Sequence, residues 1–258
     1  YAMKVVILAG GFGTRISEES HLKPKPMIEI GGMPILWHIM KIYSHYGYND
    51  FIICAGYKKE VIKEFFNNYM VYNHDVTFDF KEKKTIIHDD KIDDWKVTIV
   101  DTGLSTGTAG RLKKVQKYIG NEPFLVTYGD AVADVNIPEL VKYHESHGKY
   151  ATVTTVTLAQ TKGVLNVDDN GNILAFREKE QEDAALINGG FMVMQPEIFD
   201  YINDNELMDF ELLKELSKEG QVKAYLHEGF WQCMDTQREK QKLENMCSKG
   251  DMPWKLWD

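Results

Sequence analysis

The chain has 258 residues, 43% hydrophobic and 27% charged, a composition typical of a globular protein with room for one large α/β domain or two small ones. Its formal net charge of −9 argues against a nucleic-acid partner, because a phosphate backbone requires a basic protein face. No apolar run approaches the roughly 18–20 residues that span a bilayer and no signal peptide is visible, so no membrane partner is expected.

The first predicted element is a strand at residues 5–8, whose unbroken apolar run is typical of a strand buried on both faces. It leads directly into the glycine loop Gly10-Gly11-Phe12-Gly13-Thr14-Arg15. Glycines remove side chains where a backbone must turn sharply or approach a ligand closely. Successive backbone N–H groups in such a loop form a concave anion site, and Arg15 adds a full positive charge. The strand and loop therefore predict a site for a nucleoside triphosphate.

The glycine spacing by itself also fits a purely structural turn. It is not the dinucleotide fingerprint, whose third glycine is missing at the required spacing, nor the Walker loop, which ends in Gly-Lys-Ser/Thr. The additional evidence is Lys25, which lies between Pro24 and Pro26. Because a proline pushes the preceding residue out of the helical region, we expect Lys25 to lie on an extended, stiff segment. A lysine held in this way is a second candidate cation for the triphosphate.

The rest of the first half alternates between helical and strand patterns. Apolar residues at helical spacing predict helices at 35–46, 58–69 and 109–118. Short apolar runs predict strands at 51–55, 76–80, 85–88, 97–100 and 124–128. This order predicts a mostly parallel sheet with helices on both faces. Ligands of such sheets bind beyond the carboxyl ends of the strands, where we expect both the glycine loop and Gly129-Asp130.

The second half has shorter predicted strands, separated by turn signals such as Asp168-Asp169-Asn170-Gly171. The strands are expected at 152–157, 164–167, 173–177, 190–194 and 222–226, and the helices at 197–202, 210–218 and 236–249. No linker, low-complexity segment or internal repeat divides the chain. We therefore expect one compact α/β domain over residues 3–258, with Met3 as the natural start and a substrate-binding second half.

Two carboxylates are candidate ligands for Mg²⁺, which triphosphate chemistry normally requires and which prefers hard oxygen donors. Asp130 follows an apolar strand and is expected at its carboxyl end, although it also fits a simple turn aspartate. Asp235 follows an aromatic segment and precedes a helix, so it also fits a helix N-cap beside Thr236. The eight histidines share no metal-ligand spacing. Because Cys54, Cys233 and Cys247 suggest neither a disulfide framework nor a zinc site, we expect a reducing, cytoplasmic location.

Six segments in this order resemble the sugar-phosphate nucleotidyltransferases. They are the glycine loop, Lys23-Pro24-Lys25-Pro26, Tyr128-Gly129-Asp130, Glu178-Lys179, Asn188-Gly189-Gly190 and Trp231-x-x-x-Asp235-Thr236. Within that superfamily the chain looks most like the branch that uses CTP and α-D-glucose 1-phosphate. The segments that point to this branch are Ile30-Gly31-Gly32-x-Pro34-Ile35-Leu36-Trp37-His38-Ile39-Met40, Val100-Asp101-Thr102-Gly103 and Gly110-Arg111-Leu112-Lys113. The similarity runs from Met3 to Pro253-Trp254-Lys255.

The resemblance implies a mixed, mostly parallel sheet of dinucleotide-binding (Rossmann-like) type flanked by helices. Residues 3–130 are expected to form the nucleotide-binding half, and 131–258 a smaller sugar-phosphate-binding half with a C-terminal helix. It also implies transfer of the cytidylyl group of CTP to the sugar phosphate, giving CDP-glucose and pyrophosphate. The expected assembly is a homo-oligomer, a hexamer, with shared active sites. CDP-glucose in this family usually supplies O-antigen and other lipopolysaccharide synthesis in bacteria.

The resemblance also assigns site residues by position. The residues expected to bind the nucleotide are Leu8, Ala9, Gly10, Gly11, Gly13, Thr14, Arg15, Lys25, Thr106, Arg111 and Gly129. Those expected to bind the sugar phosphate are Glu178, Lys179 and Asn188, and those expected to bind Mg²⁺ are Asp130 and Asp235. Arg15, Lys25 and Asp130 are the expected catalytic residues.

Four departures from the family pattern lie mostly on the acceptor side: Ala131, Glu180, the loop at 160–163 and the segment at 107–110. Because these departures concern mainly the sugar pocket, CTP is better supported as the nucleotide than glucose is as the acceptor sugar. Three alternatives follow: cytidylyl transfer to another sugar or polyol phosphate, uridylyl or thymidylyl transfer to glucose 1-phosphate, and a nucleotide-binding protein without turnover.

Overall fold

The computed structural model describes residues 3–158, 164–170, 172–177, 185–202 and 209–258. Its strands are β1 Val5–Leu8, β2 Glu29–Ile30, β3 Met33–Pro34, β4 Asp50–Ala55, β5 Asp75–Asp79, β6 Lys84–His88, β7 Lys96–Asp101, β8 Phe124–Tyr128, β9 Ala131–Ala133, β10 Ala151–Leu158, β11 Val164–Val167, β12 Ile173–Arg177, β13 Ala185–Asn188, β14 Met192–Met194, β15 Val222–Leu226 and β16 Trp231–Cys233. Its α-helices are α1 Ser17–Ser20, α2 Ile35–His45, α3 Lys59–Asn73, α4 Thr108–Ile119, α5 Ile137–His147, α6 Asp209–Lys218 and α7 Gln237–Lys249.

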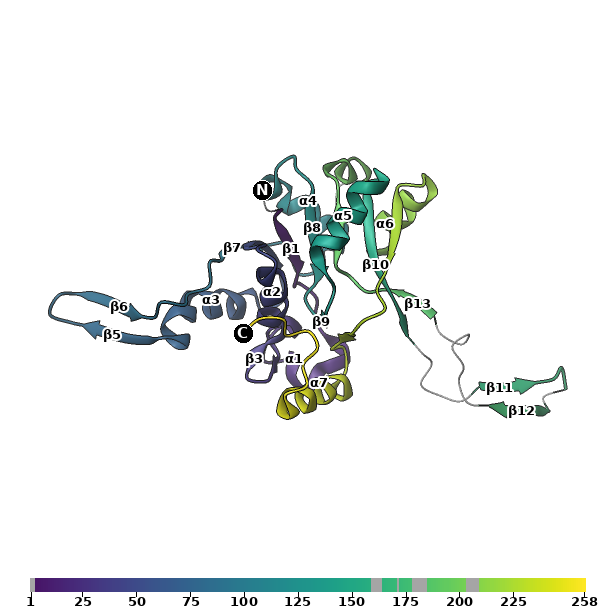
Figure 1. The fold of residues 1–258 in the computed structure, drawn as a ribbon, viewed down its shortest axis with the longest axis horizontal. Coiled ribbons are helices and arrows are strands. Elements are labelled where there is room, and N and C mark those ends of the chain that lie inside the picture. Colours follow the sequence, from purple (N-terminus) through teal and green to yellow (C-terminus); the bar gives the residue numbers. More distant parts are fainter. Residues whose placement is uncertain (1–2, 159–163, 171, 178–184, 203–208) are drawn as a thin grey trace.

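The central sheet contains eight of these strands and draws on both halves of the chain (Figure 1). Its order is β13-β10-β14-β8-β1-β4-β7, and β15 pairs with β10. The four strands from the first half, β8, β1, β4 and β7, are parallel to one another. The second half joins the sheet through the antiparallel pair of β14 with β8. This is the mixed, mostly parallel sheet expected from the sequence.

The two faces of the sheet carry separate hydrophobic layers. Side chains of a strand alternate between faces, so Val5 and Ile7 of β1 pack in one layer and Val6 and Leu8 in the other. The first layer includes apolar residues of α2, α5 and α7, and the second includes those of α4 and α6. Helices therefore cover both faces, and the carboxyl ends of β1 and β8 open on the same edge.

Most predicted elements agree with the structure, and the misses are mainly short strands. Five strands of two to four residues, β2, β3, β9, β13 and β16, were not predicted, because so few residues show no periodicity. Helices α1 and α5 were also not predicted, although α5 follows an Asn136 N-cap, has a proline in its first turn and ends at His147, just before Gly148. The strand predicted at 190–194 begins only at Met192, and the helix predicted at 197–202 is a 3₁₀ helix over Pro196–Tyr201.

The expected extended backbone at Lys25 is wrong. Pro24 is extended, but Lys25–Met27 forms one turn of 3₁₀ helix. Two backbone hydrogen bonds close the turn, from Met27 to the Pro24 carbonyl at 2.9 Å and from Ile28 to the Lys25 carbonyl at 3.0 Å. Pro26 fits there because the first turn of a helix does not need its missing N–H. The segment is thus tightly turned, and its backbone still fixes the origin of the Lys25 side chain.

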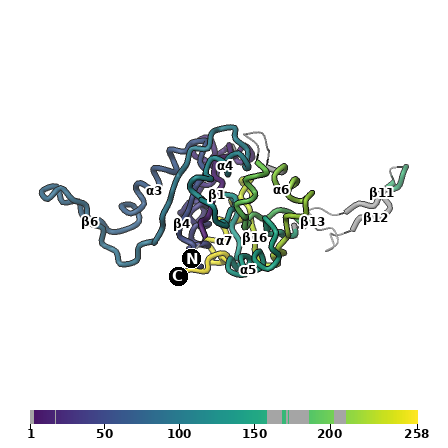
Figure 2. The backbone as a smooth tube through the Cα atoms, turned by 90° about the horizontal axis from the view of Figure 1, so that it is seen from above, coloured from purple at the N-terminus to yellow at the C-terminus, as the bar shows by residue number. Residues whose placement is uncertain are grey.

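Two hairpins extend from opposite ends of the molecule, as Figures 1 and 2 both show. One is the antiparallel pair of β5 and β6, and the other is the pair of β11 and β12. Neither pair is part of the central sheet. Among the described residues, no helix has the length and apolar character needed to cross a membrane.

Near the C-terminus, a tryptophan holds a histidine of α2 in its neutral form. His38 is 4% exposed, its Nε2 lies 2.8 Å from the Ile30 carbonyl, and its Nδ1 accepts a hydrogen bond from Trp254 Nε1 at 3.2 Å. Protonation of Nδ1 would set two donors against each other. Burial lowers the pKa of His38 to about 4, although the bond to the Ile30 carbonyl opposes this shift.

This neutral histidine makes the fold sensitive to acid. The folded pKa of His38 lies below the ordinary 6.5, so between about pH 6.5 and 4 the unfolded chain binds more protons and the free energy of unfolding falls as the pH falls. The contribution is on the order of 3 kcal/mol over that window. We expect urea unfolding of His38→Gln to show a shallower decline than wild type between pH 7 and 5. His45→Gln, which removes an exposed imidazole from the same helix, is the control, and equal slopes for the His38 variant and wild type would contradict the assignment.

Candidate functional site

Three charged side chains from distant parts of the chain meet at one point. Lys25 Nζ lies 3.0 Å from Asp130 Oδ2 and 2.5 Å from Asp235 Oδ1. All three side chains are largely buried, at 19%, 24% and 31% exposed respectively. The sequence predicts that these residues share one site, and in the structure they are in direct contact.

A small antiparallel pair of strands brings the two carboxylates together. Asp130 lies in the turn between β8 and β9, and Asp235 follows β16. Strands β9 and β16 pair with Ala131 opposite Cys233, and the N–H of Met234 donates to the Asp130 carbonyl at 2.7 Å. The β9–β16 pair therefore fixes both carboxylates on one rigid unit, although the residues are far apart in the sequence.

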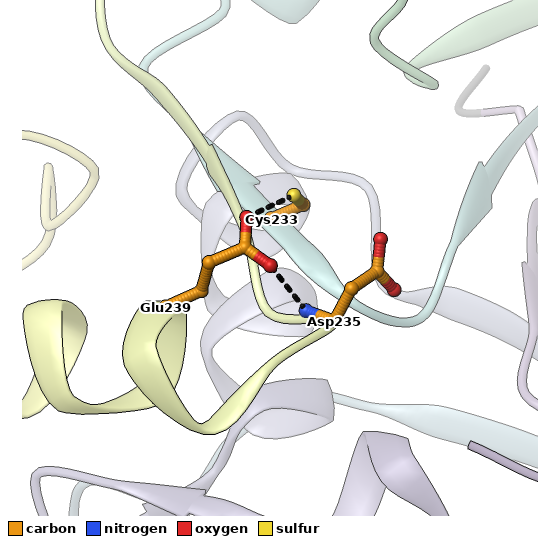
Figure 3. Close-up of side chains that lie close together, drawn as sticks. All are labelled: Cys233, Asp235 and Glu239. Carbon is orange, nitrogen blue, oxygen red and sulfur yellow. Dashed lines mark hydrogen bonds between the residues drawn. The ribbon is translucent and has the colours of Figure 1, made fainter. Parts of the chain in front are cut away.

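Asp235 is not the N-cap of α7. That position is Thr236, which forms a capping box with Glu239. Glu239 Oε1 accepts hydrogen bonds from the N–H groups of Asp235 and Thr236, and its Oε2 accepts one from Cys233 Sγ at 2.9 Å. Figure 3 shows the Asp235 carboxylate directed away from this group. The cap thus uses the backbone of Asp235 and leaves its carboxylate to Lys25.

Cys233, Asp235 and Glu239 lie close enough together to suggest a metal site, but their chemistry argues against one. Both carboxylate oxygens of Glu239 already accept hydrogen bonds. Burial raises the pKa of the Cys233 thiol, and the hydrogen bond to Glu239 raises it further. A cysteine binds a metal as its thiolate, and the raised pKa keeps Cys233 in the thiol form. This cluster therefore serves the helix cap.

The charges at the meeting point perturb one another. Burial raises the pKa of Asp130 to about 6, and although Lys25 opposes this rise, the charge of Asp235 adds to it. Burial acts in the same direction on Asp235, but hydrogen bonding to Lys25 holds its pKa below the ordinary value. Burial would lower the pKa of Lys25, and the two carboxylates instead raise it. The two carboxylates therefore stabilise the positively charged form of Lys25.

The glycine loop lies against this group. Gly13 has a φ of +65°, which favours glycine, and a Cβ there would lie 3.3 Å from Lys25 Cβ. The N–H of Gly129 donates to the Leu8 carbonyl at 3.0 Å, and a Cβ on Gly129 would lie 2.9 Å from Pro26 Cγ. Glycine at these positions lets the end of β1, the Lys25 turn and the Asp130 turn come into contact.

Arg111 organises the other side of the loop from α4. It is 6% exposed, and its guanidinium donates to Thr102 Oγ1 at 2.6 Å and to the Gly10 carbonyl at 3.1 Å. A Cβ on Gly10 would lie 1.9 Å from Arg111 Nη1, so a side chain at this position would displace the guanidinium from these hydrogen bonds. Thr106 lies beside Gly103, because a Cβ on Gly103 would be 2.7 Å from Thr106 Oγ1. Gly103 in turn lies near Arg111, since a Cβ on Gly56 would contact both the Gly103 carbonyl and Arg111 Nη1.

The remaining predicted residues of the loop are exposed to solvent, and Ala9, just before the loop, is buried. Gly11, Thr14 and Arg15 are exposed, and Ala9 is buried with its N–H donating to the Cys54 carbonyl at 2.9 Å. Burial raises the pKa of Asp235, and the positive charge of Arg15 helps to lower it, after the larger effects of Lys25 and the hydrogen bond with Asp130. Arg15 thus lies within electrostatic reach of the carboxylates.

On the acceptor side, the structure describes only part of the predicted set. Asn188 is exposed at the end of β13, and its Nδ2 donates to the Tyr128 hydroxyl at 3.1 Å. Glu178 and Lys179 lie outside the described residues, as do Glu180 and the loop at 160–163. Ala131, one of the departures, is 5% exposed within the β9–β16 pair.

Tyr128 and Trp231, which have no predicted role, contact the turn at Asn188 through their side chains. Trp231 Nε1 donates to the Gly189 carbonyl at 2.8 Å. The signal for both was their place in the quoted motifs, Tyr128-Gly129-Asp130 and Trp231-x-x-x-Asp235. A motif shows that a residue matters without showing which atom it contacts.

Known proteins resemble this chain over its whole length. The family described as Nucleotidyl transferase matches residues 4–236. A Salmonella typhi protein named glucose-1-phosphate cytidylyltransferase is 50% identical over 99% of this chain and 100% of its own length. A Bacillus subtilis protein named probable glucose-1-phosphate cytidylyltransferase is 44% identical, with the same coverage of both chains.

Solved structures match the fold at lower sequence identity. HddC from Yersinia pseudotuberculosis superposes with a TM-score of 0.67 at 24% identity, covering 96% of this chain and 99% of that chain. A UDP-glucose pyrophosphorylase complexed with UDP-glucose has the same TM-score at 19% identity, covering 97% and 100%. These structures support the fold described above.

Proposed function

The chain belongs to the nucleotidyl transferase family, and we propose that it transfers the cytidylyl group of CTP to α-D-glucose 1-phosphate, releasing CDP-glucose and pyrophosphate. The observation that carries this proposal is the contact of Lys25 with Asp130 and Asp235 beside the glycine loop. The similarity of this chain to proteins named as glucose-1-phosphate cytidylyltransferases, over almost its full length, supports the choice of nucleotide and sugar.

In the proposed reaction, an oxygen of the sugar phosphate attacks the α-phosphorus of CTP in line. A phosphorus–oxygen bond forms as the bond to pyrophosphate breaks. A phosphate monoester is already largely a dianion near neutral pH, so the step needs no general base. The protein must therefore align the two substrates and stabilise the charge that develops in the transition state.

Each charged residue has a role in this scheme. Lys25, held by the 3₁₀ turn, stabilises the charge on the α-phosphate, and the exposed Arg15 stabilises the leaving pyrophosphate. Backbone groups of residues 8–11, with Gly13, Thr14, Thr106, Arg111 and Gly129, bind the rest of the nucleotide. Glu178, Lys179 and Asn188 bind the sugar phosphate.

Asp130 and Asp235 would hold Mg²⁺. Their carboxylates offer hard oxygen donors that face one point, and their contact with the Lys25 ammonium supports a site that accepts positive charge. When bound, the ion supplies charge neutralisation on the phosphates during transfer. We assign the location to the reducing cytoplasm, in keeping with three free cysteines, and the product to bacterial surface-polysaccharide synthesis.

One assay tests the substrates. We expect pyrophosphate release to be fastest with CTP and glucose 1-phosphate when four nucleoside triphosphates are crossed with a panel of sugar and polyol phosphates. A faster rate with UTP or dTTP, or with another acceptor, would select one of the alternatives. Nucleotide binding without turnover of any pair would show a non-catalytic protein.

Charge removal tests the roles of the residues. We expect Lys25→Ala and Asp130→Asn to remain folded, with a lower thermal midpoint because each removes one partner of a partly buried ion pair, and to lose about 10²–10³-fold in kcat, the typical cost of one transition-state charge contact. Circular dichroism checks the fold, and steady-state kinetics with both substrates saturating measures kcat. Lys23→Ala, in the same segment, is the matched control. Near-normal turnover of either variant would refute the assignment.

We further propose that the chain works as a homo-oligomer in which the β5–β6 hairpin docks on a second copy. A two-stranded hairpin alone is at best marginally stable in water. This one exposes Phe78 at 53% and Phe80 at 90%, with Tyr72 of α3 at 77%. Burial of such side chains on a partner would stabilise the hairpin by removing apolar surface from water.

The hairpin predicts a specific oligomer defect. Losing a buried phenylalanine costs about 1.5–3 kcal/mol of burial, so Phe80→Ser should weaken association by roughly tenfold or more. Analytical ultracentrifugation over a concentration series measures this change, and Lys81→Ser, in the same turn, is the control. A wild-type protein that stays monomeric at micromolar concentration would overturn the proposal, as would unchanged association of the Phe80 variant.

A further inference from the structure

The turn at residues 188–191, here called the acceptor turn, has an unfavourable backbone conformation. Gly190 has a φ of +74°, and the next residue, Phe191, has a φ of +42°. A bulky side chain rarely adopts the left-handed region. Phe191 is also fully buried, at 0% exposed, so its ring is fixed in the core while its backbone is strained. Such strain persists only where the surroundings enforce it.

Hydrogen bonds from two strands of the central sheet hold the acceptor turn. The Phe191 N–H donates to Thr127 Oγ1 of β8 at 3.1 Å, and Thr154 Oγ1 of β10 donates to the Phe191 carbonyl at 2.7 Å. The Gly189 N–H donates to the Thr154 carbonyl at 2.8 Å. These bonds place the turn relative to the sheet.

A further bond comes from the unit that carries the carboxylates. Trp231 Nε1 donates to the Gly189 carbonyl at 2.8 Å, and Trp231 is the first residue of β16. Strand β16 pairs with β9, which follows Asp130, and runs toward Asp235. One indole N–H thus joins the acceptor turn to the β9–β16 pair, which fixes both carboxylates.

We propose that Trp231 is a positioning residue for the acceptor, an inference that rests on the proposed function. By holding the Gly189 carbonyl, it sets the distance between Asn188, which binds the sugar phosphate, and the Lys25–Asp130–Asp235 group, where the α-phosphorus reacts. A Cβ on Gly189 would lie 3.3 Å from Trp231 Nε1 and 3.2 Å from the Thr154 carbonyl, so Gly189 is closely packed on two sides. Its role concerns the acceptor and leaves CTP binding to the glycine loop.

Trp231→Phe tests the inference because it keeps an aromatic ring and removes the N–H. We expect the KM for glucose 1-phosphate to rise about tenfold while the KM for CTP stays within twofold of wild type. The matched control is Trp254→Phe, which also removes an indole hydrogen bond, the one to His38 in the core. That variant should lower the thermal midpoint without separating the two KM values. An unchanged acceptor KM, or an equal rise in both values, would overturn the proposal.

A second pair of variants decides the matter if Trp231→Phe does not fold. Thr127→Val removes the bond to the Phe191 N–H and should raise the acceptor KM selectively, whereas Thr127→Ser keeps the hydroxyl and should restore it. Equal acceptor KM values for the valine and serine variants would refute the role of the turn. If wild type makes no CDP-glucose, the proposed function itself fails; if it does and the variants behave like wild type, only this inference fails.

Discussion

Two partly buried carboxylates share one ammonium group, and the rest of the site is arranged around that contact. Asp130 and Asp235 would repel each other if both were charged and unpaired, and burial makes that repulsion stronger. Lys25 compensates for it at 3.0 Å and 2.5 Å. Breaking a buried ion pair by removing one partner is strongly destabilising. A site of this kind therefore has a built-in preference for positive charge, which suits the binding of a polyphosphate together with a divalent ion.

The contact requires three distant segments to be placed accurately. The Lys25 turn packs against Gly129, the Asp130 turn is part of the connection from β8 to β9, and Asp235 is carried by β16. Glycines at 13 and 129 permit the close approach of these segments. The capping box of α7 uses the backbone of Asp235, so the helix fixes this residue without occupying its carboxylate. Local helix stability and the site geometry thus depend on the same few residues.

Much of this fold follows from local patterns, whereas the site geometry depends on long-range pairing. The apolar run of β1 and the helical spacing in α2 and α4 are visible within a short window, so both type and position were predictable. The β9–β16 pair was not, because two three-residue strands carry no periodic signal and lie about a hundred residues apart. Lys25 was predicted to lie with Asp130 and Asp235, as it does, but its backbone was predicted wrongly, since the rule for residues before proline does not foresee a single 3₁₀ turn. The order of the motifs was enough to select Asp130 and Asp235 as candidates. That both contact the Lys25 ammonium could be seen only in the structure.

The late position of β16 in the chain has a consequence for biosynthesis. Lys25 and Asp130 leave the ribosome well before Asp235, and β1, β4, β7 and β8 can pair while the last segment is still being translated. A chain translated only as far as β8 therefore contains the parallel strands β1, β4, β7 and β8 but still lacks Asp235. A product terminated before β16 would lack Asp235, the strand that pairs with β9 and the core side chains Leu243 and Trp254, so we expect it to be inactive.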